Sequence, residues 1–270
     1  MTTWEPPPPE NRTTNPLKPI RRPRPIARTT GLLFNTAERN QKPVQMKVSI
    51  SLGGSLLTRS QDADSYRRYA EALRKLKRDG HRLVVVCGGG LPARQYIEIA
   101  KQLGGSGELQ DRLGILATHL NALLLIAALG DDADKRVHRR GGEVARHLDG
   151  RILVGGGHMP GSSTDYRAAL FAAAMGADLI VNATDVGGVY DRSPKTHPDA
   201  RKMDALTFTE LERIIGENVR QVPGEYGLFD LKAVRLAARL GTPVVFVDGS
   251  DPQEIVRAVE GGHSGTVVRG

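Results

Sequence analysis

Residues 82–94 read RLVVVCGGGLPAR, which predicts a buried strand, a glycine loop and a helix. The near-continuous apolar run at its start is typical of a strand covered on both faces of a sheet. Three glycines follow. Pro92 can then begin a helix without losing a hydrogen bond, because the first helical N–H groups have no partner. A strand, a tight loop and a helix in this order are the repeating unit of a parallel α/β sheet.

The same order recurs along the chain. Residues 47–52 form a β-rich run before Gly53-Gly54-Ser55, and residues 151–154 precede Gly155-Gly156-Gly157. Further strands are expected over 179–183, 244–248 and 266–268, and helices over 64–78, from Pro92 onward, and over 109–129, 165–175, 208–215, 228–240 and 252–259. This alternation predicts an α/β fold, a three-layer αβα sandwich with a central mostly parallel sheet. Ligands of such sheets bind at the carboxyl ends of the strands, where these glycine loops would lie.

The first 45 residues differ in composition from the rest of the chain. They hold nine of the 16 prolines and carry eight basic against three acidic residues, which is +5 of the total net charge of +8. We expect residues 1–45 to be a disordered, proline-rich, basic extension and residues 46–270 to be the folded domain. Because residues 46–270 carry only the remaining +3, their charge gives little reason to expect a nucleic-acid partner. If there were one, the extension would bind it.

The remaining composition excludes several classes of protein. Cys87 is the single cysteine, so no internal disulfide forms, and a reducing, cytoplasmic location is expected. We expect no apolar run of the roughly 20 residues that a membrane span needs, and therefore no membrane span. The seven histidines show no paired spacing for a metal site. Neither G-x-x-x-x-G-K-[ST] nor a strand followed by G-x-G-x-x-G occurs, so a P-loop kinase or dinucleotide site is unsupported.

Two of the loops are candidate phosphate sites. Gly53 and Gly54 allow the backbone to approach an anion closely, and Ser55 adds a further N–H group. In the loop at 88–94, the expected helix N-terminus attracts anions and Arg94 offers paired donors to phosphate oxygens. The alternative for each is an ordinary strand–helix turn, in the second case with a solvated arginine.

Two later segments extend this pattern. Residues 155–165 read GGGHMPGSSTD, in which three consecutive hydroxyl residues can donate to a phosphate or a base edge, although capping alone explains Thr164 or Asp165. We interpret Asp165 as an organising residue and not as a base. In residues 184–195, Tyr190 could pack on an adenine and Lys195 could meet charge on a transferred phosphoryl group. The alternative for this second segment is a surface hairpin with a solvated lysine.

Together these loops resemble the amino-acid kinase family, most closely its archaeal-type uridylate kinases. The resemblance covers residues 46–270, and it includes DRLGI at 111–115 and NALLLIAAL at 121–129. It implies an acceptor nucleotide half at about 46–175 and an ATP half at about 176–270. It also implies Mg²⁺ bound with ATP, a homo-oligomer (a hexamer), and UDP made for pyrimidine nucleotide biosynthesis.

The resemblance also implies roles for individual residues. The ATP site would comprise Gly53, Gly54, Ser55, Gly90, Arg94, Thr184, Asp185, Tyr190 and Ser193. The UMP site would comprise Gly89, Asp111, His158, Met159, Pro160, Gly161, Ser162, Ser163 and Thr164. Catalysis would use Arg94, Asp165 and Lys195. The chain departs from the family at Ser51, where many relatives have lysine, at Gly187 and Ser193, where they have aspartate, and at His119, where arginine is frequent.

The expected chemistry is phosphoryl transfer from Mg·ATP to UMP. A phosphate-monoester acceptor is already ionised, so no general base is needed, and positioned N–H groups and cations suffice. One alternative is a same-fold kinase with another phosphate or a carboxylate as acceptor. Isoprenoid-phosphate relatives carry a histidine in the acceptor loop, and none occurs over 88–94. Another alternative is a storage protein that holds oxyanions or nucleotides without catalysis.

Overall fold

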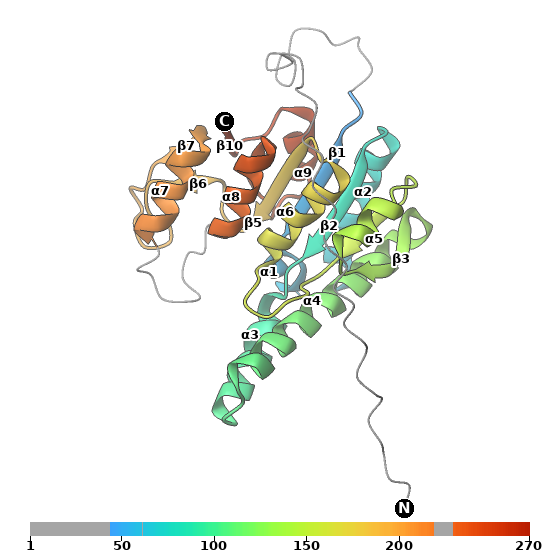
Figure 1. Ribbon diagram of the computed structural model, residues 1–270, viewed down its shortest axis with the longest axis vertical. Helices are drawn as coiled ribbons and strands as arrows, with labels where there is room; N and C mark the ends of the chain where they lie inside the picture. The colour runs from blue at the N-terminus through green and yellow to red at the C-terminus, as the bar shows by residue number, and fades with distance from the viewer. Residues whose placement is uncertain (1–43, 61, 219–228) are drawn as a thin grey trace, which may run out of the picture. The chain divides into compact units, whose positions relative to one another are not determined.

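The computed structural model describes residues 44–60, 62–218 and 229–270 (Figure 1). The predicted N-terminal extension therefore lies outside the described residues, except for its last two. The expected start of a helix at residue 228 also lies outside them.

The described residues form an eight-stranded sheet in the order β3-β4-β2-β1-β5-β9-β10-β8. Its strands are β1 (Lys47–Leu52), β2 (Arg82–Cys87), β3 (Ala133–His138), β4 (Ile152–Gly155), β5 (Leu179–Thr184), β8 (Ala205–Thr207), β9 (Val244–Asp248) and β10 (Thr266–Arg269). All neighbouring pairs are parallel except β9 with β10. Two short strands, β6 (Val189–Tyr190) and β7 (Lys202–Met203), pair separately. The predicted α/β sandwich with a mostly parallel sheet is confirmed.

Helices cover both faces of this sheet. They are α1 (Gly54–Thr58), α2 (Ala63–Arg78), α3 (Gly90–Gln102), α4 (Gly107–Leu129), α5 (Gly141–Arg146), α6 (Thr164–Met175), α7 (Phe208–Asn218), α8 (Leu231–Leu240) and α9 (Pro252–Glu260). The buried side chains of α2, α4 and α9 pack on one face, and those of α5, α6, α7 and α8 pack on the other. In Figure 1, α3 lies beside α4.

Alternation along β1 shows how the central strand serves both layers. Val48, Ile50 and Leu52 face the helices α2, α4 and α9 and are almost fully buried. Successive side chains of a strand point to opposite faces, so Ser49 and Ser51 face α6. Ser49 Oγ donates to the carbonyl oxygen of Ala168 at 2.8 Å, which fixes α6 against the sheet. Ser51 lies closer than Ser49 to the glycine loop that follows β1.

The sequence-based expectations did not include the short elements α1, β6, β7 and β8, and they also missed β3 and α5. β3 reads ADKRVH and lies at the edge of the sheet, where half of its side chains are exposed or partly exposed, so it carries no apolar pattern. α5 spans only Gly141–Arg146. The expectation of no long apolar run was also wrong, because α4 with the turn after it, Gly107–Asp132, is apolar and long enough to cross a membrane by length and composition alone. Its side chains at Ala122, Leu125 and Leu129 pack on the sheet, as in the core helix of a soluble protein.

Candidate active site

Backbone packing joins the loops that follow β1 and β2. A Cβ atom placed on Gly54 would lie 2.1 Å from the nitrogen of Gly90 and 2.5 Å from the carbonyl carbon of Gly88. Gly90 has a φ of +64°, and a Cβ atom there would lie 2.3 Å from Oγ1 of Thr58. No side chain fits at these three glycines. The start of α3, whose N–H groups attract anions, therefore lies directly against the loop after β1.

Side chains from α1, α2 and α4 hold these loops in place. Thr58 Oγ1 donates to the carbonyl oxygen of Gly54 at 2.9 Å. Asn121 on α4 is buried, and its Nδ2 donates to the carbonyl oxygen of Gly88 at 2.7 Å. The Tyr66 hydroxyl donates to Oδ1 of the same asparagine at 3.1 Å, and burial raises the pKa of Tyr66 to about 12. The hydroxyl therefore remains a donor at neutral pH, and the loop after β2 is supported through two helices.

The loop after β4, residues 156–163, is attached to α4. The nitrogen of Gly157 donates to Oγ1 of Thr118 at 2.7 Å, and Nε2 of His119 lies 2.7 Å from the carbonyl oxygen of the same glycine. Nearer the end of the loop, the nitrogen of Gly161 donates to Oδ2 of Asp111 at 2.8 Å. The structure thus brings Asp111 together with the loop that contains most of the predicted acceptor residues.

Within that loop the predicted residues differ in accessibility. Met159, Pro160 and Gly161 are exposed, whereas His158, Ser162, Ser163 and Thr164 are partly buried. Burial lowers the pKa of His158, and the charges of Arg167, Arg140 and Arg139 lower it further. The imidazole is therefore neutral at neutral pH, and the exposed residues leave the loop open to a ligand.

Two residues of this region cap helices and meet each other. Ser163 caps α6 by accepting from the nitrogen of Tyr166 at 3.0 Å, and its hydroxyl donates to Oδ2 of Asp230 at 2.6 Å. The other carboxylate oxygen of Asp230 caps α8, accepting from the nitrogen of Lys232 at 2.7 Å. The loop after β4 is thereby connected to the cap of α8, which lies 67 residues later in the chain.

Asp165 lies against the central strand. Its Oδ1 accepts a hydrogen bond from Oγ of Ser51 at 2.7 Å. Burial raises the pKa of Asp165 to about 6; the hydrogen bond from Ser51 opposes this shift, and the charge of Asp230 adds to it. The residue retains some exposed surface, but neighbouring atoms crowd its carboxyl group. Ser51, the departure from the family's lysine, is thus the hydrogen-bond partner of the predicted organising residue.

The predicted ATP segment follows β5. The nitrogen of Gly53 donates to the carbonyl oxygen of Ala183 at 2.9 Å, so the loops after β1 and β5 are adjacent. Beyond them, Lys195 forms an ion pair with Asp185, with Nζ 3.2 Å from Oδ2. This lysine side chain is 57% exposed, so it can leave its partner at little cost. The predicted hairpin with a solvated lysine and the predicted ATP segment are both compatible with this arrangement.

The other predicted residues of this segment lie around the small β6–β7 ribbon. Tyr190 in β6 is partly exposed, and Ser193 is buried with its carbonyl oxygen accepting from the nitrogens of Thr196 and His197. Thr184 ends β5, and its hydroxyl accepts from the nitrogen of Val186 at 3.2 Å. Tyr190 alone among these three presents a ring that a ligand could contact.

Arg94 is the fifth residue of α3, close to the joined glycine loops. Its side chain is exposed, and it forms no hydrogen bond or ion pair with any other residue of the described chain. An unpaired guanidinium next to a helix N-terminus is available to bind an anion in a bidentate manner. The three predicted catalytic residues come from separate elements: Arg94 from α3, Asp165 from α6 and Lys195 from the turn after β6.

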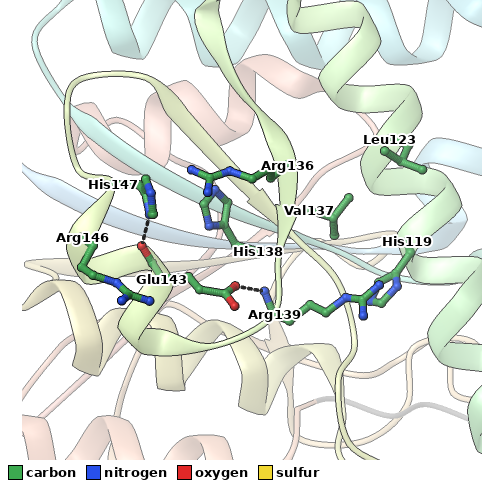
Figure 2. A pocket seen from close by; sticks show the side chains of 9 residues that line it. All are labelled: His119, Leu123, Arg136, Val137, His138, Arg139, Glu143, Arg146 and His147. Carbon is green, nitrogen blue, oxygen red and sulfur yellow. Dashed lines mark hydrogen bonds between the residues drawn. The ribbon is translucent and has the colours of Figure 1, made fainter. Parts of the chain in front are cut away.

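A cavity of about 550 Å³ lies beside this site (Figure 2). It is lined by residues of α4, β3 and α5: His119, Leu123, Arg136, Val137, His138, Arg139, Glu143, Arg146 and His147. Its one carboxylate, Glu143, accepts from the nitrogen of Arg139 at 2.8 Å, which Figure 2 draws as a dashed line. None of the predicted site residues lines it. His119 connects it with the loop after β4 by its bond to Gly157.

Sequence reasoning did not identify three residues that shape the site. Thr118 is a polar residue within the apolar pattern of α4, and Asp230 immediately precedes an amphipathic helix. These are signals of a buried contact and of a helix cap. Arg167 lies in α6 between apolar residues, and its position as a charged residue on a buried helix was the corresponding signal.

Comparison with known proteins agrees with this fold. The sequence model of the amino acid kinase family matches residues 46–248 of this chain. A uridylate kinase of Methanothermobacter thermautotrophicus is 43% identical over 227 residues, which is 83% of this chain and 99% of that protein. A uridylate kinase of Haloarcula marismortui is 42% identical over 80% of this chain and 95% of that protein.

A solved structure gives the same result. The crystal structure of uridylate kinase from Archaeoglobus fulgidus matches with a TM-score of 0.73 and 36% identity, covering 83% of this chain and all of that one. The family match and these relatives span the strands, the glycine loops and the helices from which the site is built. This chain therefore belongs to the amino acid kinase family.

Proposed function

We propose that this chain transfers the terminal phosphoryl group of ATP to UMP, giving ADP and UDP. The observation that carries the proposal is the direct packing of the loops after β1 and β2, with the unpaired Arg94 beside them. Two anionic substrates that react with each other need adjacent anion-binding loops and a nearby cation to offset their repulsion. The relatives named uridylate kinase supply the identity of the acceptor, and they do not favour a storage role.

On the donor side, the loop after β1 and the segment after β5 hold ATP. We assign its phosphates to Gly53, Gly54, Ser55, Gly90 and Arg94, and the rest of the nucleotide to Thr184, Asp185, Tyr190 and Ser193. The contact between Gly53 and Ala183 makes these two regions adjacent, which supports a single ligand across both. The exposed Lys195 would then exchange its ion-pair partner Asp185 for a phosphate oxygen.

On the acceptor side, UMP lies between the loops after β2 and β4. We assign it to Gly89, Asp111, His158, Met159, Pro160, Gly161, Ser162, Ser163 and Thr164. The hydrogen bond from Gly161 to Asp111 supports this grouping, because it brings the start of α4 to the loop after β4. Gly89 itself contacts α4, since a Cβ atom on it would lie 3.4 Å from the carbonyl oxygen of Gly114.

Transfer needs alignment and charge neutralisation more than proton transfer. The UMP phosphate is already ionised, so the reaction proceeds by in-line attack of its oxygen on the terminal phosphorus of ATP. Arg94 and Lys195 offset the charge that gathers on the transferred group. Asp165, held by Ser51, orients donors at the junction of the loops and is not required as a base.

Mg²⁺ fits this site as a companion of ATP. Residues 44–60, 62–218 and 229–270 contain no cluster of three or more side chains that could hold a metal on their own. Mg²⁺ in kinases keeps its waters and binds through substrate phosphates with one or two carboxylates, so Asp165 is the residue that would hold it here. When bound, Mg²⁺ neutralises charge on the phosphate oxygens.

We further propose that the enzyme is a homo-oligomer, a hexamer, with the exposed side of α3 and α4 in an interface. Large apolar side chains are exposed along both helices: Leu91, Tyr96, Ile99, Leu103, Leu109, Leu116, Leu120, Leu123 and Leu124. Those at 96, 99 and 103 share one side of α3, as their spacing requires. Apolar surfaces of this extent mark interaction sites, and a second copy of this chain is the partner. A cytoplasmic location and a role in pyrimidine nucleotide biosynthesis remain predictions.

The test is a coupled ADP-release assay with Mg·ATP and a panel of acceptors: UMP, CMP, dUMP, AMP and N-acetylglutamate. Turnover with UMP well above that with AMP or the carboxylate is expected. Arg94→Ala should remove most of it, whereas Arg78→Ala, an exposed position at the end of α2, should not. If folded protein binds ATP but releases no ADP with any of these acceptors, the proposal is wrong.

A further inference from the structure

Arg167 is a buried arginine that lacks hydrogen-bond partners at two of its three side-chain nitrogens. The residue is 4% exposed, and its Nε and Nη2 atoms are buried with no hydrogen-bond partner among the described residues. Burial lowers the pKa of its guanidinium. Buried donors without acceptors are costly, and the cost is larger for a charged group. A position like this is explained when a ligand supplies the missing acceptors.

The guanidinium lies near the end of β4, where the loop of residues 156–163 begins. Side chains of an α-helix lean toward its N-terminus, and α6 begins at the end of that loop. Cζ of Arg167 lies 5.8 Å from the centre of the Phe171 ring. That ring in turn lies against Gly155, where an added Cβ atom would be 2.6 Å from Cε2. The arginine charge also acts on His158, a residue of the same loop.

Among residues 44–60, 62–218 and 229–270, no carboxylate forms an ion pair with this arginine. The cations Arg139 and Arg140 lie within range of the same histidine, and the nearby Glu143 is already engaged, accepting from the nitrogens of Arg139 and Arg140 at 2.8 and 3.2 Å. The charge around Arg167 is therefore positive. Its unpaired Nε and Nη2 atoms are hydrogen-bond donors, because an arginine side chain has no acceptor.

The position of this group along the sheet matches the distal end of the acceptor. Within the proposed acceptor site, we assign the phosphate of UMP to the loop after β2, which contains Gly89 and lies near β1, and the ribose to Asp111. β4 lies two strands from β1 in the sheet order, about 10 Å at the usual strand spacing. A nucleotide whose phosphate lies between β1 and β2 and whose ribose contacts Asp111 places its base at the loop after β4, over Arg167.

We propose that Arg167 determines base specificity by donating hydrogen bonds to the 4-carbonyl oxygen of the uracil ring. This inference rests on the proposed function and names the residue that distinguishes its substrate. Uracil carries an acceptor at position 4, whereas cytosine carries an amino donor there. The guanidinium N–H groups can donate to the carbonyl oxygen of uracil. They cannot bond to the amino group of cytosine, because both groups are donors.

The test compares UMP and CMP as acceptors in wild type, Arg167→Met and Arg167→Lys. Methionine keeps an unbranched side chain over Phe171 and has no donor, and lysine keeps charge and donors without the planar fork. Loss of a hydrogen bond from a charged group corresponds to about a 10- to 100-fold fall in kcat/KM for UMP. The value for CMP should fall less or rise, so the UMP-to-CMP ratio collapses in the methionine variant and partly recovers in the lysine variant. Arg78→Met is the matched control, with an unchanged ratio.

The outcomes separate this inference from the function on which it rests. If wild type turns over UMP and Arg167→Met keeps the wild-type ratio within about twofold, Arg167 does not read the base. If wild type turns over no pyrimidine nucleotide, the proposed function fails and the inference fails with it. Should the methionine variant not fold, as judged by its thermal unfolding, the lysine variant decides: an unchanged ratio overturns the inference, and a ratio lowered several-fold supports it.

Discussion

Replacing Gly54 by alanine should separate the two loops on which phosphoryl transfer depends. The added Cβ atom would lie 2.1 Å from the nitrogen of Gly90, which is 1.3 Å less than the 3.4 Å at which ordinary van der Waals contact begins. The atoms that it meets are backbone, so no side chain can rotate away. Either the loop after β1 or the loop after β2 must therefore move by about that distance.

This displacement gives two magnitudes. Forcing an extra methyl group into a closely packed site costs about 1–3 kcal/mol of stability. A displacement of about 1 Å between reacting groups lowers turnover by on the order of 100-fold. We therefore expect Gly54→Ala to lower the free energy of unfolding by about 2 kcal/mol and kcat/KM for UMP by about two orders of magnitude.

Denaturant unfolding and coupled ADP release measure these two effects. Gly262→Ala is the matched control, because a Cβ atom there meets nothing within 4 Å and its φ is not in the left-handed region. That control should be neutral or slightly stabilising, by up to about 1 kcal/mol. If Gly54→Ala kept both wild-type stability and wild-type turnover, the close packing of the two loops would have no bearing on the reaction.

Four other expected outcomes follow from the site. Arg94→Ala should lower kcat/KM by about two orders of magnitude in the ADP-release assay with an unchanged unfolding midpoint, because the side chain has no partner to lose; a normal rate would remove it from the mechanism. Asp165→Asn should flatten stability against pH: since the folded-state pKa, about 6, exceeds the ordinary 3.8, the native carboxyl keeps its proton longer than the unfolded one, and wild-type stability falls as pH rises from about 4 to about 6. If the free energy of unfolding, measured in urea at several pH values over that range, changed equally with pH in both proteins, this expectation would be wrong. Asn121→Ala should cost about 1–3 kcal/mol in denaturant unfolding, because the buried carbonyl oxygen of Gly88 loses its side-chain donor; an unchanged midpoint would show that this donor is dispensable. Leu120→Glu should shift the assembly to smaller species in light scattering if α4 lies in the interface, and an unchanged mass would exclude that side of the helix.

Strands and helices with a clear apolar pattern were predictable from the sequence. β1 and β2 were expected at their observed bounds, and α6 one residue late, because their buried positions follow the period of each element. β3 was not predictable in this way. Its buried Asp134 is accommodated by Arg136, which donates to it through backbone and side chain, so polar pairing replaces apolar patterning at this edge.

The site was predictable as a set of loops and not as a set of contacts. Glycines after strands indicated where anions would bind, since only glycine permits such close approach of backbones. The partners of those loops come from distant parts of the chain: Asn121 reaches Gly88 across 33 residues, and Ser163 reaches Asp230 across 67. The raised pKa of Asp165 likewise depends on burial that no local pattern expresses.

The bond between Ser163 and Asp230 has a thermodynamic consequence for the two substrates. Ser163 belongs to the loop assigned to the acceptor, while Asp230 caps a helix in the part of the chain assigned to ATP. A ligand that shifts one of them changes the energy of the other. If ATP changes the affinity for the acceptor by some factor, the acceptor changes the affinity for ATP by the same factor. If each nucleotide shifts this bond, the two dissociation constants will be linked through α6 and α8, and each will depend on the concentration of the other nucleotide.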